Sequence, residues 1–181
     1  MSAARPIHRD VVSYVRRSAR MNESQLKAWR THHKDWVIEV DAGERETSVS
    51  PQARVDWTAR FGREAPVMVE IGSGTGQAIT ALAQAHPQAN LVAFEVFTPA
   101  VASTLSRLAR EDVTNVRMVV ADGAQGVETL FAASSITELW TFFPDPWHEA
   151  RNSVMEEAAK SVSTPWADRK STRLNSSHVA L

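Results

Sequence analysis

Short apolar runs alternate with longer segments of helical spacing through the middle of the chain. Four runs rich in Val, Ile, Leu and aromatic residues predict buried strands at 67–71, 91–96, 116–120 and 136–143. Five segments predict helices at 23–34, 50–61, 78–85, 98–110 and 126–132. Strands that alternate with helices in this way predict an α/β fold built on a parallel sheet.

Two of the predicted helices have clear end signals. Asn22 and Gln25 form a variant of the capping box ahead of the first helix. Ser50 and Pro51 suit the N-cap and first positions of the second helix, and Gly62 suits its end. We therefore expect the second helix to begin at Ser50.

The strand 67–71 runs into a glycine-rich turn. Gly72, Gly74 and Gly76 alternate with other residues, and Glu70 stands two positions before the first glycine. Such a turn leads onto a helix N-terminus, where backbone N–H groups are free to meet a ligand. A dinucleotide-binding turn has its third glycine one residue later. The pattern resembles the first motif of S-adenosylmethionine (SAM) dependent methyltransferases, with a nucleotide-binding or purely structural turn as alternatives.

Acidic residues also stand at or just after the ends of the next three predicted strands. Glu95 lies twenty-three residues after Gly72, a spacing at which an acid in Rossmann-like sheets binds ribose hydroxyls. Asp122 can accept from an adenine amine, or it can be a plain turn residue. Asp145 lies between two prolines and precedes Trp147, in a rigid turn that favours a functional role. The carboxyl ends of parallel strands share one edge, so these acids predict one ligand site.

Composition restricts the number of domains, the kinds of site and the compartment. A chain of 181 residues without Cys predicts one domain, no disulfide and no Cys-ligated metal. His32 and His33 are adjacent and make a poor metal pair, so we expect no metal site. No membrane-length apolar run or secretory segment is present, which favours the cytoplasm.

Charge is unevenly distributed along the chain. Residues 1–34 contain eight Lys/Arg and two acids, whereas residues 35–165 contain nine Lys/Arg and eighteen acids. We expect a basic N-terminal arm at 1–22 that meets a polyanion, with a solvated tail as the alternative. Arg16, Arg17 and Arg20 are its candidate phosphate contacts.

Over about residues 12–151 the chain resembles the bacterial tRNA (guanine-N7)-methyltransferase family, which methylates guanine 46 of tRNA. The motifs that carry the resemblance are Ser13-Tyr14-Val15-Arg16-Arg17, Arg20-Met21 with Gln25, Glu70 to Gly76, Glu95-Val96, Asn115-Val116-Arg117, Asp122 and Phe142-Phe143-Pro144-Asp145-Pro146-Trp147-His148. The resemblance implies a Rossmann-like class I SAM-dependent methyltransferase domain at 23–165. It also implies a cofactor site formed by Glu70, Gly72, Gly74, Glu95, Asp122 and Asp145.

The resemblance also implies a sparse catalytic site. Guanine N7 is already an unprotonated lone pair, so no general base is needed and positioning dominates. Asp145 is the implied catalytic residue, which accepts hydrogen bonds from the guanine and turns N7 toward the methyl group. Trp147 can stack on the base. Arg151 joins Arg16, Arg17 and Arg20 as a candidate tRNA contact.

The chain departs from the family pattern after Trp147. Glu149 stands where the family has Lys, and the later strands and the Thr-x-x-Glu segment are not found. The polar segment 166–181 resembles non-native sequence, with a natural disordered tail as the alternative. We therefore expect an incomplete domain that is marginally stable and has little or no activity. The main alternative function is a SAM- or RNA-binding module without catalysis, and the glycine spacing disfavours a nicotinamide-dependent oxidoreductase.

Overall fold

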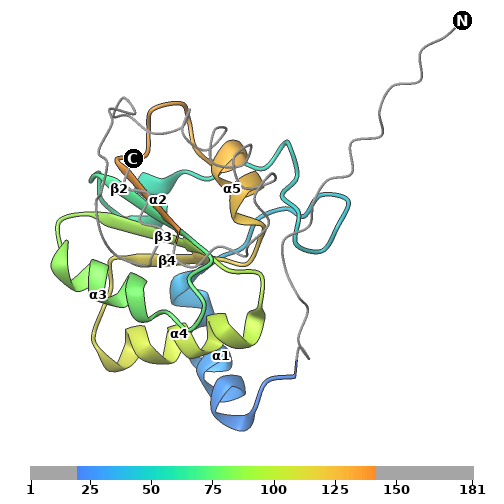
Figure 1. Cartoon of the computed structure of the whole chain (residues 1–181), viewed down its shortest axis with the longest axis vertical. Helices are drawn as coiled ribbons and strands as arrows, with labels where there is room; N and C mark the ends of the chain where they lie inside the picture. The colour runs from blue at the N-terminus through green and yellow to red at the C-terminus, as the bar shows by residue number, and fades with distance from the viewer. Residues whose placement is uncertain (1–19, 142–181) are drawn as a thin grey trace, which may run out of the picture.

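A computed structural model describes residues 20–141 of the 181-residue chain, and it contains a five-stranded sheet flanked by helices (Figure 1). The strands are β1 Val37–Ile38, β2 Val67–Ile71, β3 Asn90–Phe94, β4 Val116–Val119 and β5 Glu138–Thr141. The helices are α1 Glu23–Trp36, α2 Trp57–Phe61, α3 Gln77–Ala85, α4 Thr98–Arg110 and α5 Gly123–Leu130.

The sheet is parallel, with the strand order β1-β4-β3-β2-β5. The chain moves outward from β2 through β3 to β4, and then returns across the sheet to place β5 on the other side of β2. This reversal beside β2 is the switch point of a doubly wound sheet, where such folds bind ligands outside the carboxyl ends of the strands. The predicted Rossmann-like α/β fold is confirmed.

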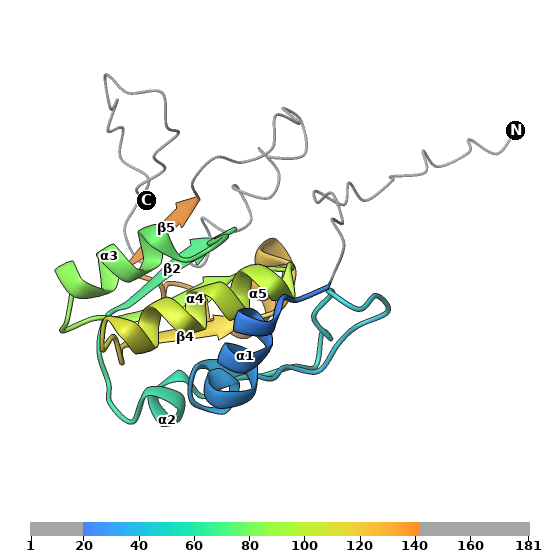
Figure 2. The same ribbon diagram turned by 90° about the horizontal axis from the view of Figure 1, so that it is seen from below.

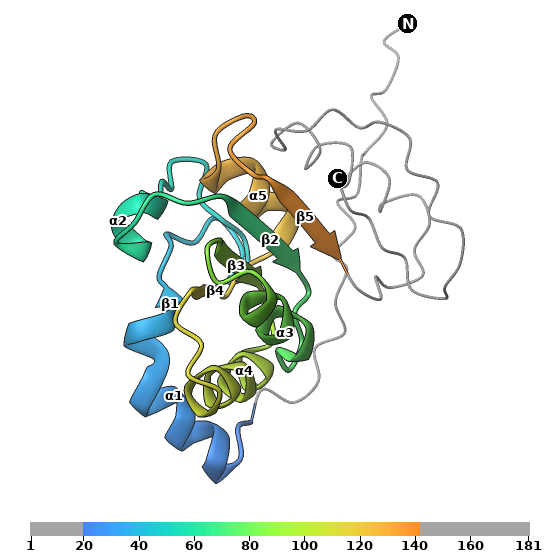
Figure 3. The same ribbon diagram turned by 90° about the vertical axis from the view of Figure 1, so that its left-hand side faces the viewer.

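Helices cover both faces of the sheet. In Figures 2 and 3, α1, α3 and α4 lie on one face, whereas α2 and α5 lie on the other. Right-handed crossovers account for this division, because α5 belongs to the connection that runs back across the sheet. A hydrophobic core lies on each face of the sheet, and successive residues of a strand point alternately into the two cores. Met68 and Leu91 pack with α3 and α4, while Val69 and Val92 pack with α5.

Helix α1 is fixed to α4 along its length. Its capping box is present as predicted, because Asn22 accepts from the Gln25 N–H and Gln25 accepts from the Asn22 N–H. The Gln25 amide also donates to the Pro99 carbonyl at 3.0 Å and lies 3.1 Å from the Ser103 hydroxyl. At the other end, the Trp36 indole N–H donates to the Val113 carbonyl at 3.1 Å. The two helices therefore run in parallel.

The predicted helix at 50–61 is wrong in its first half. Ser50 and Pro51 belong to a turn closed by the Ala53 N–H on the Ser50 carbonyl, and α2 begins only at Trp57. Asp56 is the actual N-cap and accepts from the Ala59 N–H. The predicted end is right, because Gly62 takes a left-handed conformation at the C-cap.

Other boundaries differ by smaller amounts. The fifth helix begins at Gly123 rather than at 126, since Asp122 caps it, and the two-residue strand β1 was not predicted. Strand β5 begins at Glu138 rather than at 136. Within residues 20–141, no helix is long and apolar enough to cross a membrane, and no group of His, Cys, Asp or Glu could hold a metal ion.

Candidate functional site

Four parallel strands end together at one edge of the sheet. Ile71, the last residue of β2, pairs with the last residues of β3 and β5, which are Phe94 and Thr141. Phe94 in turn pairs with Val119 at the end of β4. Three of the predicted site acids stand at this carboxyl edge: Glu70, Glu95 and Asp122.

The turn after β2 has a backbone that favours glycine. Gly72, Gly74 and Gly76 have φ angles of 75°, 55° and 78°, in the left-handed region. A Cβ on Gly72 or Gly74 would meet nothing within 4 Å, whereas one on Gly76 would lie 2.5 Å from Thr104 Cγ2. The first two glycines therefore leave the backbone open to a ligand, and the third allows the turn to pack against α4.

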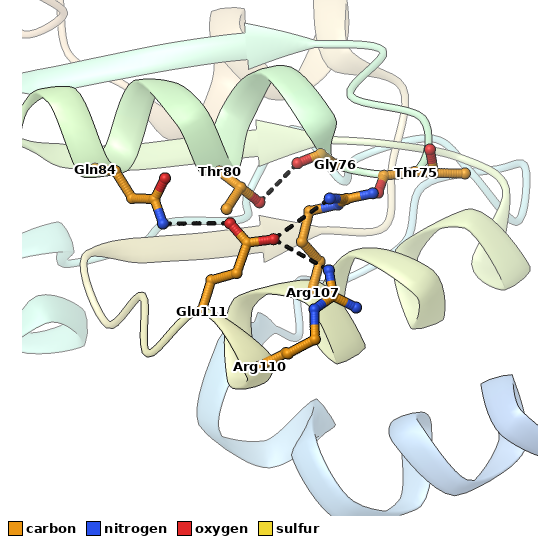
Figure 4. A network of polar contacts seen from close by, with 7 residues as sticks. All are labelled: Thr75, Gly76, Thr80, Gln84, Arg107, Arg110 and Glu111. Carbon is orange, nitrogen blue, oxygen red and sulfur yellow. Dashed lines mark hydrogen bonds and ion pairs between the residues drawn. The ribbon is translucent and has the colours of Figure 1, made fainter.

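Two buried threonines fix this turn against the helices. Thr80 Oγ1 donates to the Gly76 carbonyl at 2.7 Å, a bond visible at the start of α3 in Figure 4. Thr104 Oγ1 lies 3.2 Å from the Gly74 carbonyl and 3.2 Å from the Ala100 carbonyl. Sequence reasoning missed both threonines, because a single polar residue inside an apolar helix gives no signal of its own.

Glu95 holds the turn from the end of β3. Its Oε2 accepts from the Gly74 N–H at 2.8 Å, and its Oε1 accepts from the Phe97 N–H at 2.9 Å. A carboxylate offers about four acceptor positions, so these two bonds leave others for the hydroxyl groups of a ligand. Glu95 is only half-buried, and it lies directly beside the open glycines.

Two buried polar atoms of this segment have no hydrogen-bond partner among residues 20–141. They are Glu70 Oε2 and Ser73 Oγ, on side chains of residues that are 1% and 7% exposed. Leaving such an atom unpaired costs about 1–3 kcal/mol, so paired atoms are the rule in protein interiors. Ser73 was not predicted, because it occupies a position between glycines that the motif leaves open.

Burial also changes the acidity of Glu70. It raises the pKa of the Glu70 carboxyl from 4.5 to about 7; the charge of Glu95 adds to the rise, and a hydrogen bond from the Ile79 backbone opposes it. Glu70 pairs with Ala93, so Glu95, two residues further on, faces the same side of the sheet. A carboxyl group with a strongly raised pKa at a strand end is typical of a functional site.

Asp122 has a structural role at the end of β4. Its Oδ1 accepts from the N–H groups of Ala124 and Gln125 at 3.0 and 3.1 Å, which caps α5. Its own N–H donates to the Thr47 carbonyl at 2.7 Å. Its Oδ2 makes no hydrogen bond to another residue of the described part. The turn role and a ligand role are therefore compatible, because they use different oxygens.

The remaining predicted site residues are mostly outside the described part of the chain. Asp145, Trp147, Arg151, Arg16 and Arg17 lie beyond residues 20–141. Arg20 is described; it is exposed, two residues before the N-cap of α1. The described site is therefore the glycine turn with its three acids.

A cavity of about 410 Å³ lies elsewhere, among residues that precede β2, β3 and β4. Loops before parallel strands lie at the amino edge of a sheet, away from the glycine turn. Its lining mixes Arg63 and Arg117 with Glu111 and Asp112, so no single charge dominates it. The candidate site is therefore marked by its polar groups and open glycines rather than by cavity size.

Residues 64–155 match the model of a protein family described as "Putative methyltransferase". The chain belongs to this methyltransferase family. The match covers 92 of the 181 residues, and it includes the glycine turn and all three acids of the carboxyl edge.

Curated relatives confirm the resemblance seen in the sequence. A tRNA (guanine-N(7)-)-methyltransferase of Cutibacterium acnes is 46% identical over 146 residues, which are 81% of this chain and 53% of that protein. One of Paenarthrobacter aurescens is 43% identical and covers 78% of this chain and 47% of that protein. The chain thus spans about half the length of the curated relatives it matches. Among solved structures, a 16S rRNA (adenine(1408)-N(1))-methyltransferase of Catenulisporales acidiphilia is 19% identical with a TM-score of 0.46, over 68% of this chain and 58% of that chain.

Proposed function

We propose that this chain carries the SAM site of a tRNA (guanine-N7-)-methyltransferase, which transfers a methyl group to guanine N7 of tRNA in the cytoplasm. The observation that carries the proposal is the pair of buried atoms without a partner among residues 20–141, Glu70 Oε2 and Ser73 Oγ, at a glycine turn held by Glu95, with Asp122 at the same edge of the sheet. The names of the curated relatives supply the substrate and the reaction.

The residues at the carboxyl edge fit the chemistry of SAM. Glu95 has acceptor positions left for the two hydroxyls of a ribose, since its bonds to the N–H groups of Gly74 and Phe97 use only two of about four. Asp122 Oδ2 can accept from the adenine amine while Oδ1 caps α5. The open backbone at Gly72 and Gly74 admits a ligand at close range.

Glu70 has a different role in this proposal. It is 1% exposed, so it acts from below the turn as a negative charge rather than as a surface contact. A cationic ligand bound above it favours the ionised carboxylate and opposes the effect of burial. Glu70 thereby favours the positively charged methionine end of SAM.

Methyl transfer then depends on positioning. SAM supplies a methyl group on a sulfonium, and guanine N7 supplies the lone pair, so the protein need not remove a proton first. Asp145 accepts from the guanine N1–H and N2 amine and turns N7 toward the methyl group. Trp147 stacks on the base. Arg16, Arg17, Arg20 and Arg151 contact phosphates, which fixes the register of the tRNA.

The proposal is tested by SAM binding and methyl transfer in the same preparation. Calorimetric titration of the chain with SAM should give one site per chain. Incubation with methyl-labelled SAM and an unmodified tRNA transcript should place label in N7-methylguanine, at a low rate because Glu149 stands where the family pattern has Lys. Asp145→Ala should remove the label even at a SAM concentration that saturates the variant, because Asp145 orients the guanine as well as lying at the cofactor.

Four outcomes decide between the enzyme, a binding module and the absence of a SAM site. SAM binding together with label in N7-methylguanine supports the proposal. SAM binding without transfer to any guanine overturns the enzymatic part and leaves a binding module. No SAM binding overturns the site itself, and an Asp145→Ala variant with unchanged turnover removes Asp145 from its role.

A further inference from the structure

A polar groove lies between α1, α4 and the glycine turn. Its volume is about 260 Å³, and its lining comes from three segments that are far apart in the sequence. The side chains that matter here are Ser24 of α1, Thr75 of the turn, and Ser103, Ser106, Arg107 and Arg110 of α4. None of the residues described above as cofactor contacts lines it, so it is distinct from the SAM site.

The charge of this groove is unusual for the protein. Residues 20–141 contain eleven Lys and Arg against fifteen Asp and Glu, so this part of the chain is acidic overall. The groove is lined by two guanidinium groups and by no carboxylate among these described residues. Because the surrounding body is acidic, affinity for an anion here would come from local contacts rather than from a general attraction.

The two guanidinium groups are held in place and still have donors left. Arg107 lies 3.4 Å from Glu111 Oε1, and Arg110 lies 3.1 Å from the same oxygen (Figure 4). The Arg107 Nε–H also points at the Thr75 carbonyl at 3.5 Å. A guanidinium has five N–H donors in a planar fork, so these bonds orient both groups without exhausting them.

Hydroxyl groups complete the lining. The side-chain hydroxyls of Ser24, Ser106 and Thr75 line the groove and make no hydrogen bond to another residue in the described range. Ser103 is engaged with the Pro99 carbonyl and the Gln25 amide. Guanidinium forks together with free hydroxyls match the oxygens of a phosphate, which accepts several hydrogen bonds at once.

From this arrangement we propose that the groove between α1 and α4 binds a phosphate of the RNA backbone, with Arg107 and Arg110 as its cationic contacts. The inference rests on the proposed function, since it takes tRNA as the polyanion. Thr75 belongs to the proposed SAM turn, and Arg20 lies just ahead of α1, so an RNA strand that passes from Arg20 to the methyl group can cross the groove.

The test measures the affinity of the full 181-residue chain for a fluorescent tRNA transcript between about 50 and 200 mM salt. Arg110→Gln should weaken binding about tenfold and reduce the slope of log affinity against log salt by about 1. The double variant with Arg107→Gln should reduce the slope by about 2. Arg45→Gln is the matched control, because it removes one exposed positive charge outside the groove.

A further variant, at Glu111, should strengthen tRNA binding instead of weakening it. Both guanidinium groups contact the same oxygen of Glu111, Oε1, and the Gln84 amide donates to the other oxygen, Oε2. Glu111→Gln releases the arginines from their anionic partner, so tRNA binding should strengthen by about threefold relative to Glu44→Gln, an exposed acid outside the groove. SAM affinity should not change in any of these variants.

The outcomes separate this inference from the proposed function. An unchanged salt slope in the double variant, with SAM affinity intact, overturns the phosphate site even if the protein methylates tRNA. A reduced slope without methyl transfer supports the site and overturns the enzymatic proposal. Equal losses in Arg45→Gln and Arg110→Gln, or no tRNA binding by the unaltered chain, also overturn the phosphate site.

Discussion

Glu70 is a carboxyl group inside a buried parallel strand, 1% exposed and with one oxygen unpaired within the described range. Desolvation of a charged carboxylate is costly, and the nearby charge of Glu95 increases that cost. A hydrophobic residue at this position would avoid that desolvation cost. The acid is therefore better explained by its place beneath the glycine turn than by packing.

The raised pKa of Glu70 determines how the stability of the fold changes with pH. Glu70 titrates at about 7 in the folded protein against 4.5 ordinarily, so between these values the folded state keeps a proton that the unfolded state releases. Stability from this group therefore falls as pH rises and is lowest above about 7. Glu70→Gln cannot ionise, so its stability relative to the unaltered protein should improve by about 2–3 kcal/mol from about pH 5 to about pH 8.

Urea denaturation at the two pH values measures this difference. Glu44→Gln serves as the control, because Glu44 is exposed and its substitution removes the same charge from the protein. A Glu70→Gln variant whose relative stability does not change with pH would show that Glu70 is ionised throughout, through a partner outside residues 20–141.

At the scale of elements, Gln25 makes the side-chain hydrogen bonds that join the first turn of α1 to the first turns of α4. Gln25 accepts from the Asn22 N–H, donates to the Pro99 carbonyl and contacts the Ser103 hydroxyl. Gln25→Ala should lower the free energy of unfolding by about 2 kcal/mol, with roughly 1 kcal/mol for each part-buried bond. Lys27→Ala, on the exposed side of the same helix, should change it by less than about 0.5 kcal/mol. Equal effects of the two substitutions would contradict this attachment.

Helix α5 offers a way to separate the two roles of Asp122. Asp122→Asn keeps a side-chain oxygen for the N–H groups of Ala124 and Gln125, so stability should stay within about 0.5 kcal/mol. Asp122→Ala loses the cap and should cost about 1 kcal/mol. In Asp122→Asn the second acceptor becomes an amide donor, so SAM affinity should fall severalfold. Calorimetry with SAM on both variants measures this, and unchanged affinity in Asp122→Asn would leave Asp122 as a cap only.

The elements that could be predicted from the sequence are those specified by local signals. Helix α4 was predicted at 98–110 because Pro99 and the spacing of its apolar residues both mark it. The helix at 50–61 was predicted too long because Ser50 and Pro51 also suit a turn, and tertiary packing of Ala53 into the core decides between them. Strand β1 has only two residues and exists through its pairing with β4, which leaves no pattern to detect.

At the scale of the whole molecule, the candidate site combines predictable and unpredictable parts. The glycine turn and the acids at the strand ends follow from motif spacing and from the rule that parallel strands share one carboxyl edge. The buttressing of Gly74 and Gly76 by Thr104 depends on contacts between segments about thirty residues apart, which no local pattern encodes. The groove at Arg107 and Arg110 likewise requires α1, α4 and the turn to be assembled first.

Because Glu95 joins the turn to the sheet and also has acceptor positions for a ribose, it should couple SAM binding to the stability of the whole fold. SAM at about 100 times its dissociation constant should stabilise the unaltered chain by about 2.7 kcal/mol, or a Tm increase of about 5–10 °C. Glu95→Gln places an amide donor against one of the N–H groups of Gly74 and Phe97, so it should lower Tm and remove most of the SAM-induced increase. Glu138→Gln is the control, since Glu138 is the first residue of β5 and lies at the amino ends of the strands, away from the glycine turn. Differential scanning fluorimetry with and without SAM measures both quantities, and an equal SAM-induced increase in the two variants would exclude Glu95 from the site.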